Sequence, residues 1–194
     1  MTGPPAAEDD DAETVRQSLE QPELFARLYD RYAPDIHRYA ARRLGEGAAD
    51  DLTADTFLIA FRTRGRYDLG RRNARPWLYG IAANLIGRHR RGEERALRAF
   101  ARTGHDPVAE SWTDRSDARV SAQAPLAGAL AALSARDRHV LLLVAWADLS
   151  YQEVAEALGI PLGTVRSRLN RARRTVRRAL GDDPAFRFET SEVS

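Results

Sequence analysis

Several residue types are missing from this chain of 194 residues, and each absence excludes a class of chemistry. Cysteine is absent, which excludes disulfides, thiolate zinc sites and a thiol redox sensor within the chain. Lysine is also absent: all 30 basic residues are arginine, the side chain best suited to bidentate contacts with phosphate and guanine. No apolar run approaches the ~20 residues of a membrane span, and nothing at the N-terminus resembles a signal peptide. We therefore expect a cytoplasmic protein without a membrane segment.

The motifs of common enzyme classes are missing as well. The 4 histidines are scattered, and neither a Walker loop nor a G-x-S-x-G or H-E-x-x-H signature occurs. Paired acids such as Asp50 and Asp51 belong to a charged helix surface rather than to a recognisable acid–base site. The sequence therefore predicts neither catalytic activity nor a metal or other cofactor.

Charge is distributed in blocks, although the formal net charge is only +2. Residues 22–92 carry +6 and residues 126–180 carry +5, whereas the segments 1–21, 93–125 and 181–194 carry −5, −1 and −3. Two basic blocks between acidic ends predict two modules that face nucleic acid. The acidic arm 1–21 has little to bury and is expected to be disordered, and 181–194 is expected to be an acidic tail.

The segment 93–125 has no sustained apolar period and is expected to be a flexible linker between the modules. A chain of that length reaches about 110 Å when fully stretched but averages only about 30 Å as a flexible coil. Its single tryptophan, Trp112, fits either an anchor for the linker or an incidental exposed side chain.

The strongest local pattern lies at residues 150–180. Ser150 and Glu153 have the spacing of a capping box, and Gly159 lies where a helix end favours a left-handed residue. The helix after Pro161 keeps apolar residues on one stripe and carries arginines on its other faces. Such a helix can bury one side and place the other in the major groove of DNA. A solvated bundle helix is the alternative, but 7 arginines without an acid would repel one another there.

The first basic block is predicted to be helical throughout, because the alternation typical of strands is missing. Pro34 is expected to restart a helix, and a polar, glycine-containing loop is expected at 64–75. Apolar residues recur at helical spacing in four segments: 22–32, 34–44, 48–63 and 76–91. Together with the C-terminal helices, this pattern predicts an all-α chain of two small helical domains.

Specific stretches of the chain also resemble a known family. The conserved central domain of bacterial sigma factors is similar to ADDLTADTFLIAFR (49–62) and RPWLYGIAANLIGRHRR (75–91). Their C-terminal promoter-reading domain is similar to LSARDRHVLLLVAWADLSYQEVAEALGIPLGTVRSRLNRARRTVRRAL (133–180). Two domains, a linker and little else is the layout of the extracytoplasmic-function group. The resemblance implies a four-helix central domain at 22–92, a terminal helix-turn-helix domain at 126–180, and a protein that directs promoter-specific transcription initiation.

The resemblance also implies roles for the central domain. The loop at 64–75 and the helix after it would melt the minus-10 element and hold its single strand. Trp77 is expected in the core, whereas Tyr67 is the expected stacking surface for a base. Asn84 fits a contact with a flipped base and, equally, an ordinary amide on a helix surface. The residues assigned to the minus-10 strand are Arg66, Tyr67, Arg71, Arg75, Asn84 and Arg88. The third helix would bind core RNA polymerase through Asp50, Asp51, Asp55, Phe57 and Arg62, with an ordinary amphipathic helix as the alternative.

In the terminal domain, the resemblance assigns five residues to the minus-35 element: Arg166, Ser167, Asn170, Arg171 and Arg174. The first four form one contiguous strip of a helix, beside its apolar stripe. Arg166 or Arg171 is expected to contact a guanine, and Arg174 to contact phosphate or stay solvated. Family members often carry an aromatic or aliphatic residue at the position of Asn170, so Asn170 is expected to change the base preference.

The implied partners are the largest subunits of core RNA polymerase, promoter DNA in duplex and single-stranded form, and an anti-sigma factor. The free chain is expected to be a monomer. The competing interpretation is a conventional helix-turn-helix repressor or activator, which would bind duplex DNA alone as a dimer. An adaptor that binds polymerase without reading promoters fits the first domain but leaves the second unused.

Overall fold

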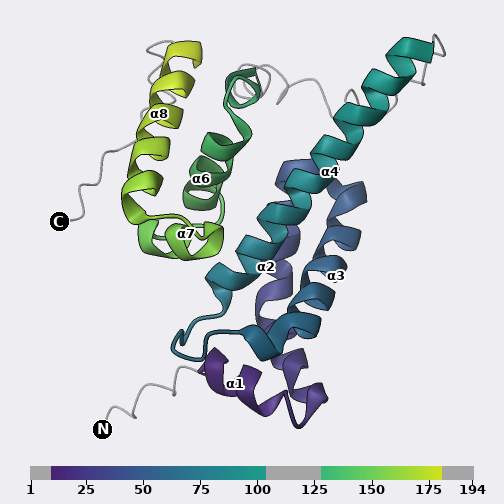
Figure 1. Ribbon diagram of the computed structural model, residues 1–194, viewed down its shortest axis with the longest axis vertical. Helices are drawn as coiled ribbons and strands as arrows, with labels where there is room; N and C mark the ends of the chain where they lie inside the picture. Colours follow the sequence, from purple (N-terminus) through teal and green to yellow (C-terminus); the bar gives the residue numbers. More distant parts are fainter. Residues whose placement is uncertain (1–9, 104–127, 181–194) are drawn as a thin grey trace, which may run out of the picture.

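The computed structural model describes residues 10–103 and 128–180, and these residues form helices and connecting turns without a strand. The N-terminal domain contains α1 (Asp11–Gln17), α2 (Ala26–Leu44), α3 (Glu46–Thr63) and α4 (Arg75–Thr103), with short 3₁₀ turns at Pro22–Phe25 and Arg64–Arg66. After a helical turn at 128–131, the C-terminal domain contains α6 (Ala135–Ala145), α7 (Tyr151–Leu158) and α8 (Leu162–Leu180) (Figure 1). The prediction of an all-α chain with two helical domains is confirmed for this part of the chain.

α1 corrects the expectation that the whole arm 1–21 is disordered. Asp10 caps this helix by accepting a hydrogen bond from the Ala12 N–H at 3.1 Å, and Val15 is fully buried. The segment folds because a capping residue and acids in the first turn precede a small apolar face. The first nine residues lie outside the described part of the chain.

α2 corrects a second expectation, because Pro34 lies inside one continuous helix rather than at the start of a new one. A proline within a helix removes one hydrogen bond and costs about 3 kcal/mol or more. Leu28 before it and Ile36 and Tyr39 after it are all buried in one core, and this shared burial offsets that cost. The helix ends at Gly45, whose φ of 88° is a conformation that glycine adopts without a Cβ clash.

The core of the N-terminal domain lies between α2, α3 and α4. The rings of Tyr39 and Tyr79 meet edge to face at 5.3 Å, which joins α2 to α4. Trp77 is half-buried against this core, as expected, and does not form an exposed stacking platform.

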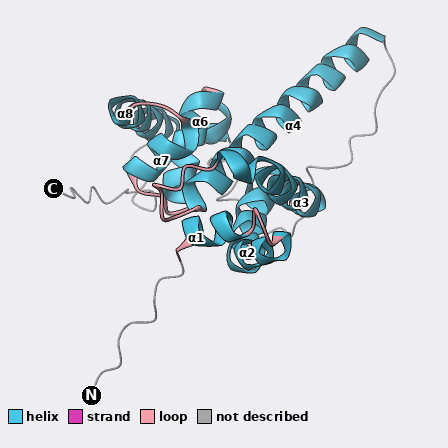
Figure 2. Ribbon diagram, turned by 60° about the horizontal axis from the view of Figure 1, so that its bottom comes forward, coloured by secondary structure: helices cyan, strands magenta, loops and turns pink. Residues whose placement is uncertain are grey.

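α4 is longer than the sequence analysis expected. It continues to Thr103, so the first part of the segment expected to be a linker at 93–125 is helical, and the end of α4 projects beyond the other helices (Figures 1 and 2). Trp112 and the tail 181–194 lie outside the described residues. Although α4 has 29 residues, neither it nor any other described helix is long and apolar enough to cross a membrane.

The C-terminal domain follows its local sequence signals closely. Ser150 and Glu153 form the predicted capping box, with hydrogen bonds of 3.2 and 2.8 Å, and Gly159 ends α7 in the left-handed conformation at φ 61°. Arg138 binds the carbonyl oxygens at the end of the helical turn that precedes α6. The predicted apolar stripe of α8 had five residues; Leu162 is only partly buried, and the four that are buried are Val165, Leu169, Ala172 and Val176.

The two domains contact each other, mainly through α4 and α7 (Figure 1). Gly80 of α4 is buried against the backbone of Ala157 on α7. This contact brings the turn before α7 next to the loop that joins α3 to α4.

Candidate nucleic-acid interface

The first candidate surface is a polar strip on α8. Because Val165 and Leu169 are buried, the opposite side of the helix is turned outward. Ser167 is partly turned back, since its hydroxyl donates to the Thr164 carbonyl at 3.1 Å. All five residues assigned to the minus-35 element are exposed: Arg166, Ser167, Asn170, Arg171 and Arg174.

Arg171 differs from its neighbours on this strip. Its Nε and Nη2 donate to the two carboxylate oxygens of Asp137 at 3.0 and 3.1 Å. Asp137 is buried in the first turn of α6, and its backbone N–H donates to the Ser134 hydroxyl. The fork of Arg171 therefore joins α8 to α6, as bidentate arginine–carboxylate pairs do. The expected guanine contact by Arg166 or Arg171 stays a prediction, and the paired fork of Arg171 favours Arg166 for it.

The second candidate surface is the loop that leads into α4. Tyr67 was expected to be an exposed stacking surface, but it is only 8% exposed. Its ring lies 4.9 Å from that of Trp77, and its hydroxyl donates to the Arg71 carbonyl at 2.5 Å. Burial raises the pKa of Tyr67 above its ordinary value, so the hydroxyl stays protonated and remains a donor. Tyr67 thus stabilises the loop from inside, which corrects the expected role.

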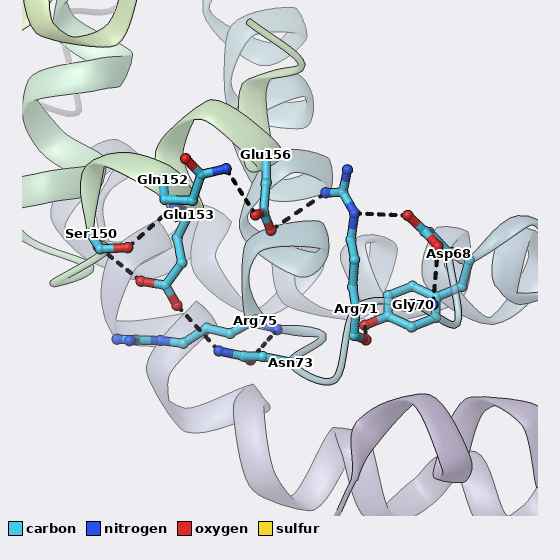
Figure 3. Close-up of polar contacts among 10 residues, drawn as sticks. Asp68, Gly70, Arg71, Asn73, Arg75, Ser150, Gln152, Glu153 and Glu156 are labelled. Carbon is cyan, nitrogen blue, oxygen red and sulfur yellow. Dashed lines mark hydrogen bonds and ion pairs between the residues drawn. The ribbon is translucent and has the colours of Figure 1, made fainter. Parts of the chain in front are cut away.

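The middle of this loop contacts α7 (Figure 3). The Asn73 side-chain amide donates to Glu153 at 3.2 Å, and Arg71 lies 3.5 Å from the Glu156 carboxylate. The other oxygen of Glu153 accepts from the Ser150 N–H, so one carboxylate both caps α7 and holds the loop.

Arg75 makes a similar contact at the start of α4. Its Nη2 donates to the Ala147 carbonyl at 2.5 Å and its Nη1 to the Asp148 carbonyl at 3.5 Å. Asp148 has a φ of 50°, a left-handed conformation that aspartate tolerates better than most residues. Arg71 and Arg75, which were assigned to the melted strand, therefore face the C-terminal domain in this arrangement. Arg66 remains exposed.

Two assigned residues lie further along α4. Asn84 and Arg88 are both exposed and one helical turn apart. They share one side of α4 and are open to a ligand while the loop before them is in contact with α7.

The third candidate surface is the exposed side of α3. Its acids Asp51 and Asp55 are exposed with Arg62, and Leu58 lies between them with 44% of its surface exposed. These residues fall at helical spacing on one face. Asp50 lies to one side of this face and reaches His37 of α2 at 3.1 Å.

Phe57 was assigned to the polymerase-binding surface, but the structure buries it. Its ring meets that of Tyr29 at 4.9 Å, edge to face, across the α2–α3 contact. Phe57 therefore supports α3 from the core, and the neighbouring Leu58 is the apolar residue that a partner can touch. The helical period already placed Phe57 on the apolar side of α3, so it was the family resemblance that misassigned it to the polymerase surface.

Several residues with specific contacts were not singled out from the sequence. Asn73, Gly80 and Asp137 carry no local signal, because each acts on a residue far along the chain. Asp11 carried a weak signal: it follows a good capping residue and precedes Val15 at helical spacing. Glu153 was predicted as a capping residue, but its hydrogen bond with the Asn73 side chain was not predicted.

Comparison with known proteins gives the family. The model of sigma-70 region 2 matches residues 28–96, and that of sigma-70 region 4 matches residues 123–176. The ECF RNA polymerase sigma factor BldN of Streptomyces coelicolor is 31% identical over 194 residues, which cover 92% of this chain and 70% of BldN. The RNA polymerase sigma factor CarQ of Myxococcus xanthus is 33% identical over 161 residues, which cover 82% of this chain and 91% of CarQ.

Solved structures agree with this match. CnrH, in complex with the cytosolic domain of CnrY, superposes with a TM-score of 0.63 at 26% identity, covering 89% of this chain and 97% of that one. The sigma factor RpoE of Bartonella quintana, solved with the anti-sigma factor NepR, has the same fold, with a TM-score of 0.59 at 24% identity, covering 82% of this chain and 98% of that one. The chain therefore belongs to the extracytoplasmic-function (ECF) RNA polymerase sigma factors. It directs promoter-specific transcription initiation.

Proposed function

We propose that the two domains divide promoter recognition between them, and that core RNA polymerase and promoter DNA are the direct partners of this chain. The proposal rests on the α8 strip: Arg166, Arg171 and Arg174 are exposed, whereas the apolar side of the helix is buried at Val165, Leu169, Ala172 and Val176. Such a helix fits the major groove of a duplex, where base edges are distinguishable. The chain has no catalytic step of its own in this scheme, and it acts in the cytoplasm, where the polymerase works.

The α8 strip is assigned to the minus-35 element. Arg166, near the start of the helix, is the proposed guanine contact, because Arg171 is paired with Asp137. Asn170 lies one turn after Arg166 and is proposed to contact an adjacent base edge. Arg174 is one turn further along and is assigned to phosphate.

The loop at 64–75 and the exposed side of α4 are assigned to the melted minus-10 strand. Arg66, Asn84 and Arg88 are exposed and supply charge and a polar amide. Arg71 and Arg75 join them only when the domains separate, since both now face the C-terminal domain. The two domains must also separate if the chain is to contact the minus-35 and minus-10 elements at the same time, because the helix-turn-helix lies directly against α4 in this arrangement.

The exposed face of α3 is assigned to the largest subunits of core polymerase. Asp51, Asp55 and Arg62 offer charge, and Leu58 offers an apolar anchor among them. A buried apolar anchor with a charged rim is the usual composition of a protein interface.

A regulator is proposed as a further partner. CnrH, which this chain resembles in fold, was solved with the cytosolic domain of CnrY. The chain has no cysteine with which to sense redox state itself. We therefore propose that an anti-sigma factor holds the free, monomeric chain, and that the signal reaches it through that partner.

The division of labour is tested on a promoter selected in vitro with the wild-type holoenzyme. Arg166→Ala is expected to weaken the upstream footprint, whereas Asn84→Ala is expected to keep that footprint and lower permanganate reactivity at the minus-10 element. The reverse pattern would show that the two surfaces are assigned wrongly. Tight binding of the isolated chain to a duplex operator, without any transcription from core polymerase, would favour a conventional repressor.

A further inference from the structure

α1 and the turn after it contact both ends of the loop assigned to the single strand. At the start of the loop, Arg64 Nε donates to the Ser18 carbonyl at 3.3 Å. At its end, the Asp11 N–H donates to the Arg72 carbonyl at 3.1 Å, and the Ala74 N–H donates to the Asp11 carboxylate at 2.8 Å. Asp11 of α1 and its C-cap residue Ser18 thus hold the loop near both of its ends.

Asp11 is the centre of these contacts. It is 2% exposed, and its carboxylate accepts from the Arg31 guanidinium as well as from the Tyr32 hydroxyl at 2.6 Å. Burial, and then the bond to Asp11, raise the pKa of Tyr32 above its ordinary value, so the hydroxyl stays protonated and remains a donor. The same hydroxyl lies 3.4 Å from the Asn73 side-chain oxygen. Asp11 therefore links α1, α2 and the loop in one buried network.

α1 lies outside the family match, which begins at residue 28. Asp11 holds the backbone of residues 72–74. Asn73 lies within this stretch, Arg71 directly precedes it and Arg75 directly follows it. A loop that is already in its binding conformation does not have to be ordered when the ligand binds, and this raises affinity.

We propose that Asp11 is a positioning residue for the minus-10 loop: its carboxylate holds residues 72–74 so that the neighbouring polar side chains meet the melted strand. This inference rests on the proposed function of the loop. Asp11 does not contact DNA in this scheme, since its carboxylate is buried and already bonded.

The test compares Asp11→Asn with Glu13→Gln, a control variant that replaces another acid of the same helix. Among the residues that the structure describes, Glu13 bonds only Arg16 and Gln17 of α1, and these bonds lower its pKa to about 2, so Glu13→Gln also removes one negative charge. Asp11→Asn is expected to speed hydrogen exchange of the Ala74 amide by about tenfold and to reduce minus-10 permanganate reactivity by a similar factor. The upstream footprint of the holoenzyme is expected to stay unchanged. Glu13→Gln is expected to change none of these measurements.

Tyr32→Phe is the milder variant if Asp11→Asn does not fold. It removes one hydrogen bond to the carboxylate and keeps the ring, so smaller changes in the same direction are expected. Normal Ala74 exchange in both variants, or fast exchange with normal promoter opening, would overturn the positioning role. Failure of the wild-type holoenzyme to open any promoter would instead count against the proposed function, and the exchange measurement would still decide whether Asp11 holds the loop.

Discussion

Gly80 of α4 lies so close to Ala157 of α7 that a Cβ built on the glycine would be 2.3 Å from the Ala157 carbonyl oxygen. That distance is far below van der Waals contact, so any side chain at position 80 forces the two helices apart. The hydrogen bonds from Asn73 to Glu153 and from Arg75 to Ala147 lie in the same interface. The closed arrangement therefore depends on both shape and polar contacts, and it engages Arg71, Asn73 and Arg75 while leaving the α8 strip exposed.

Gly80→Ala is expected to separate the two domains. Within a helix this substitution ordinarily stabilises by about 1 kcal/mol, so the N-terminal domain itself should remain folded. Because the chain has no cysteine, spin labels at Glu46→Cys and Ala179→Cys, both exposed positions, report the distance between the domains cleanly. We expect one narrow distance distribution for the wild-type chain and a broad, longer one for Gly80→Ala.

Gly47→Ala is the control, because a Cβ at that helical position meets nothing within 4 Å. It should leave the distance distribution unchanged. Identical narrow distributions for all three chains would show that the α4–α7 contact does not depend on Gly80.

Arg171→Ala is expected to act on stability rather than on base recognition. It removes the partner of the buried Asp137 carboxylate and should lower the free energy of unfolding by about 1–2 kcal/mol; the arginine side chain is 57% exposed, which limits the effect. Denaturant unfolding measures the loss. Unchanged stability together with lost discrimination at one base pair would return Arg171 to the role of a base contact.

Arg166→Ala and Arg178→Ala are expected to separate base contacts from phosphate contacts on α8. Arg166 lies early in the helix, so its loss should cost about 1–3 kcal/mol at one base pair of the minus-35 element. Arg178 is exposed near the end of the helix, and its loss should weaken binding to all promoter sequences alike. It should also reduce the slope of log affinity against log salt concentration by about one. Titration of the holoenzyme on single-substituted promoters at several salt concentrations measures both. Equal effects of the two variants on every sequence would contradict the assignment.

Leu58→Ala and Phe57→Ala test neighbouring residues with opposite exposure. Phe57 is buried, so its truncation should destabilise the N-terminal domain by about 3–5 kcal/mol. Leu58 is 44% exposed, so its truncation should change stability by no more than about 0.5 kcal/mol and weaken binding to core polymerase. Thermal unfolding and a binding titration with core polymerase measure the two effects. Normal core affinity of Leu58→Ala would remove this face of α3 from the interface.

The features that were predicted from the sequence are local or periodic. The capping box at Ser150 and Glu153, the left-handed Gly159 and the apolar stripe of α8 each depend on residues within a few turns of one another. Local chemistry specifies such features almost alone, so one sequence was sufficient. The exposure of Arg166, Arg171 and Arg174 on α8 followed from the same periodicity.

The features that were missed or predicted wrongly from the sequence depend on contacts between distant residues. Tyr67 lies in a polar loop and was therefore expected to be exposed. It is buried instead, because its ring packs against Trp77 and its hydroxyl donates to the Arg71 carbonyl. Arg171 lies on the polar strip, and its pairing with Asp137 is set by how α6 and α8 pack. The continuity of α2 through Pro34 likewise depends on the core rather than on local preference.

Promoter-specific initiation is tested by adding the purified chain to sigma-free core polymerase on genomic DNA and sequencing the 5′ ends of the transcripts. We expect discrete start sites that share an upstream and a downstream element at constant spacing, and we expect them to be lost when Arg166→Ala is combined with Asn84→Ala. A chain that yields no transcripts with core polymerase, but binds a duplex operator tightly as a dimer, would contradict this expectation.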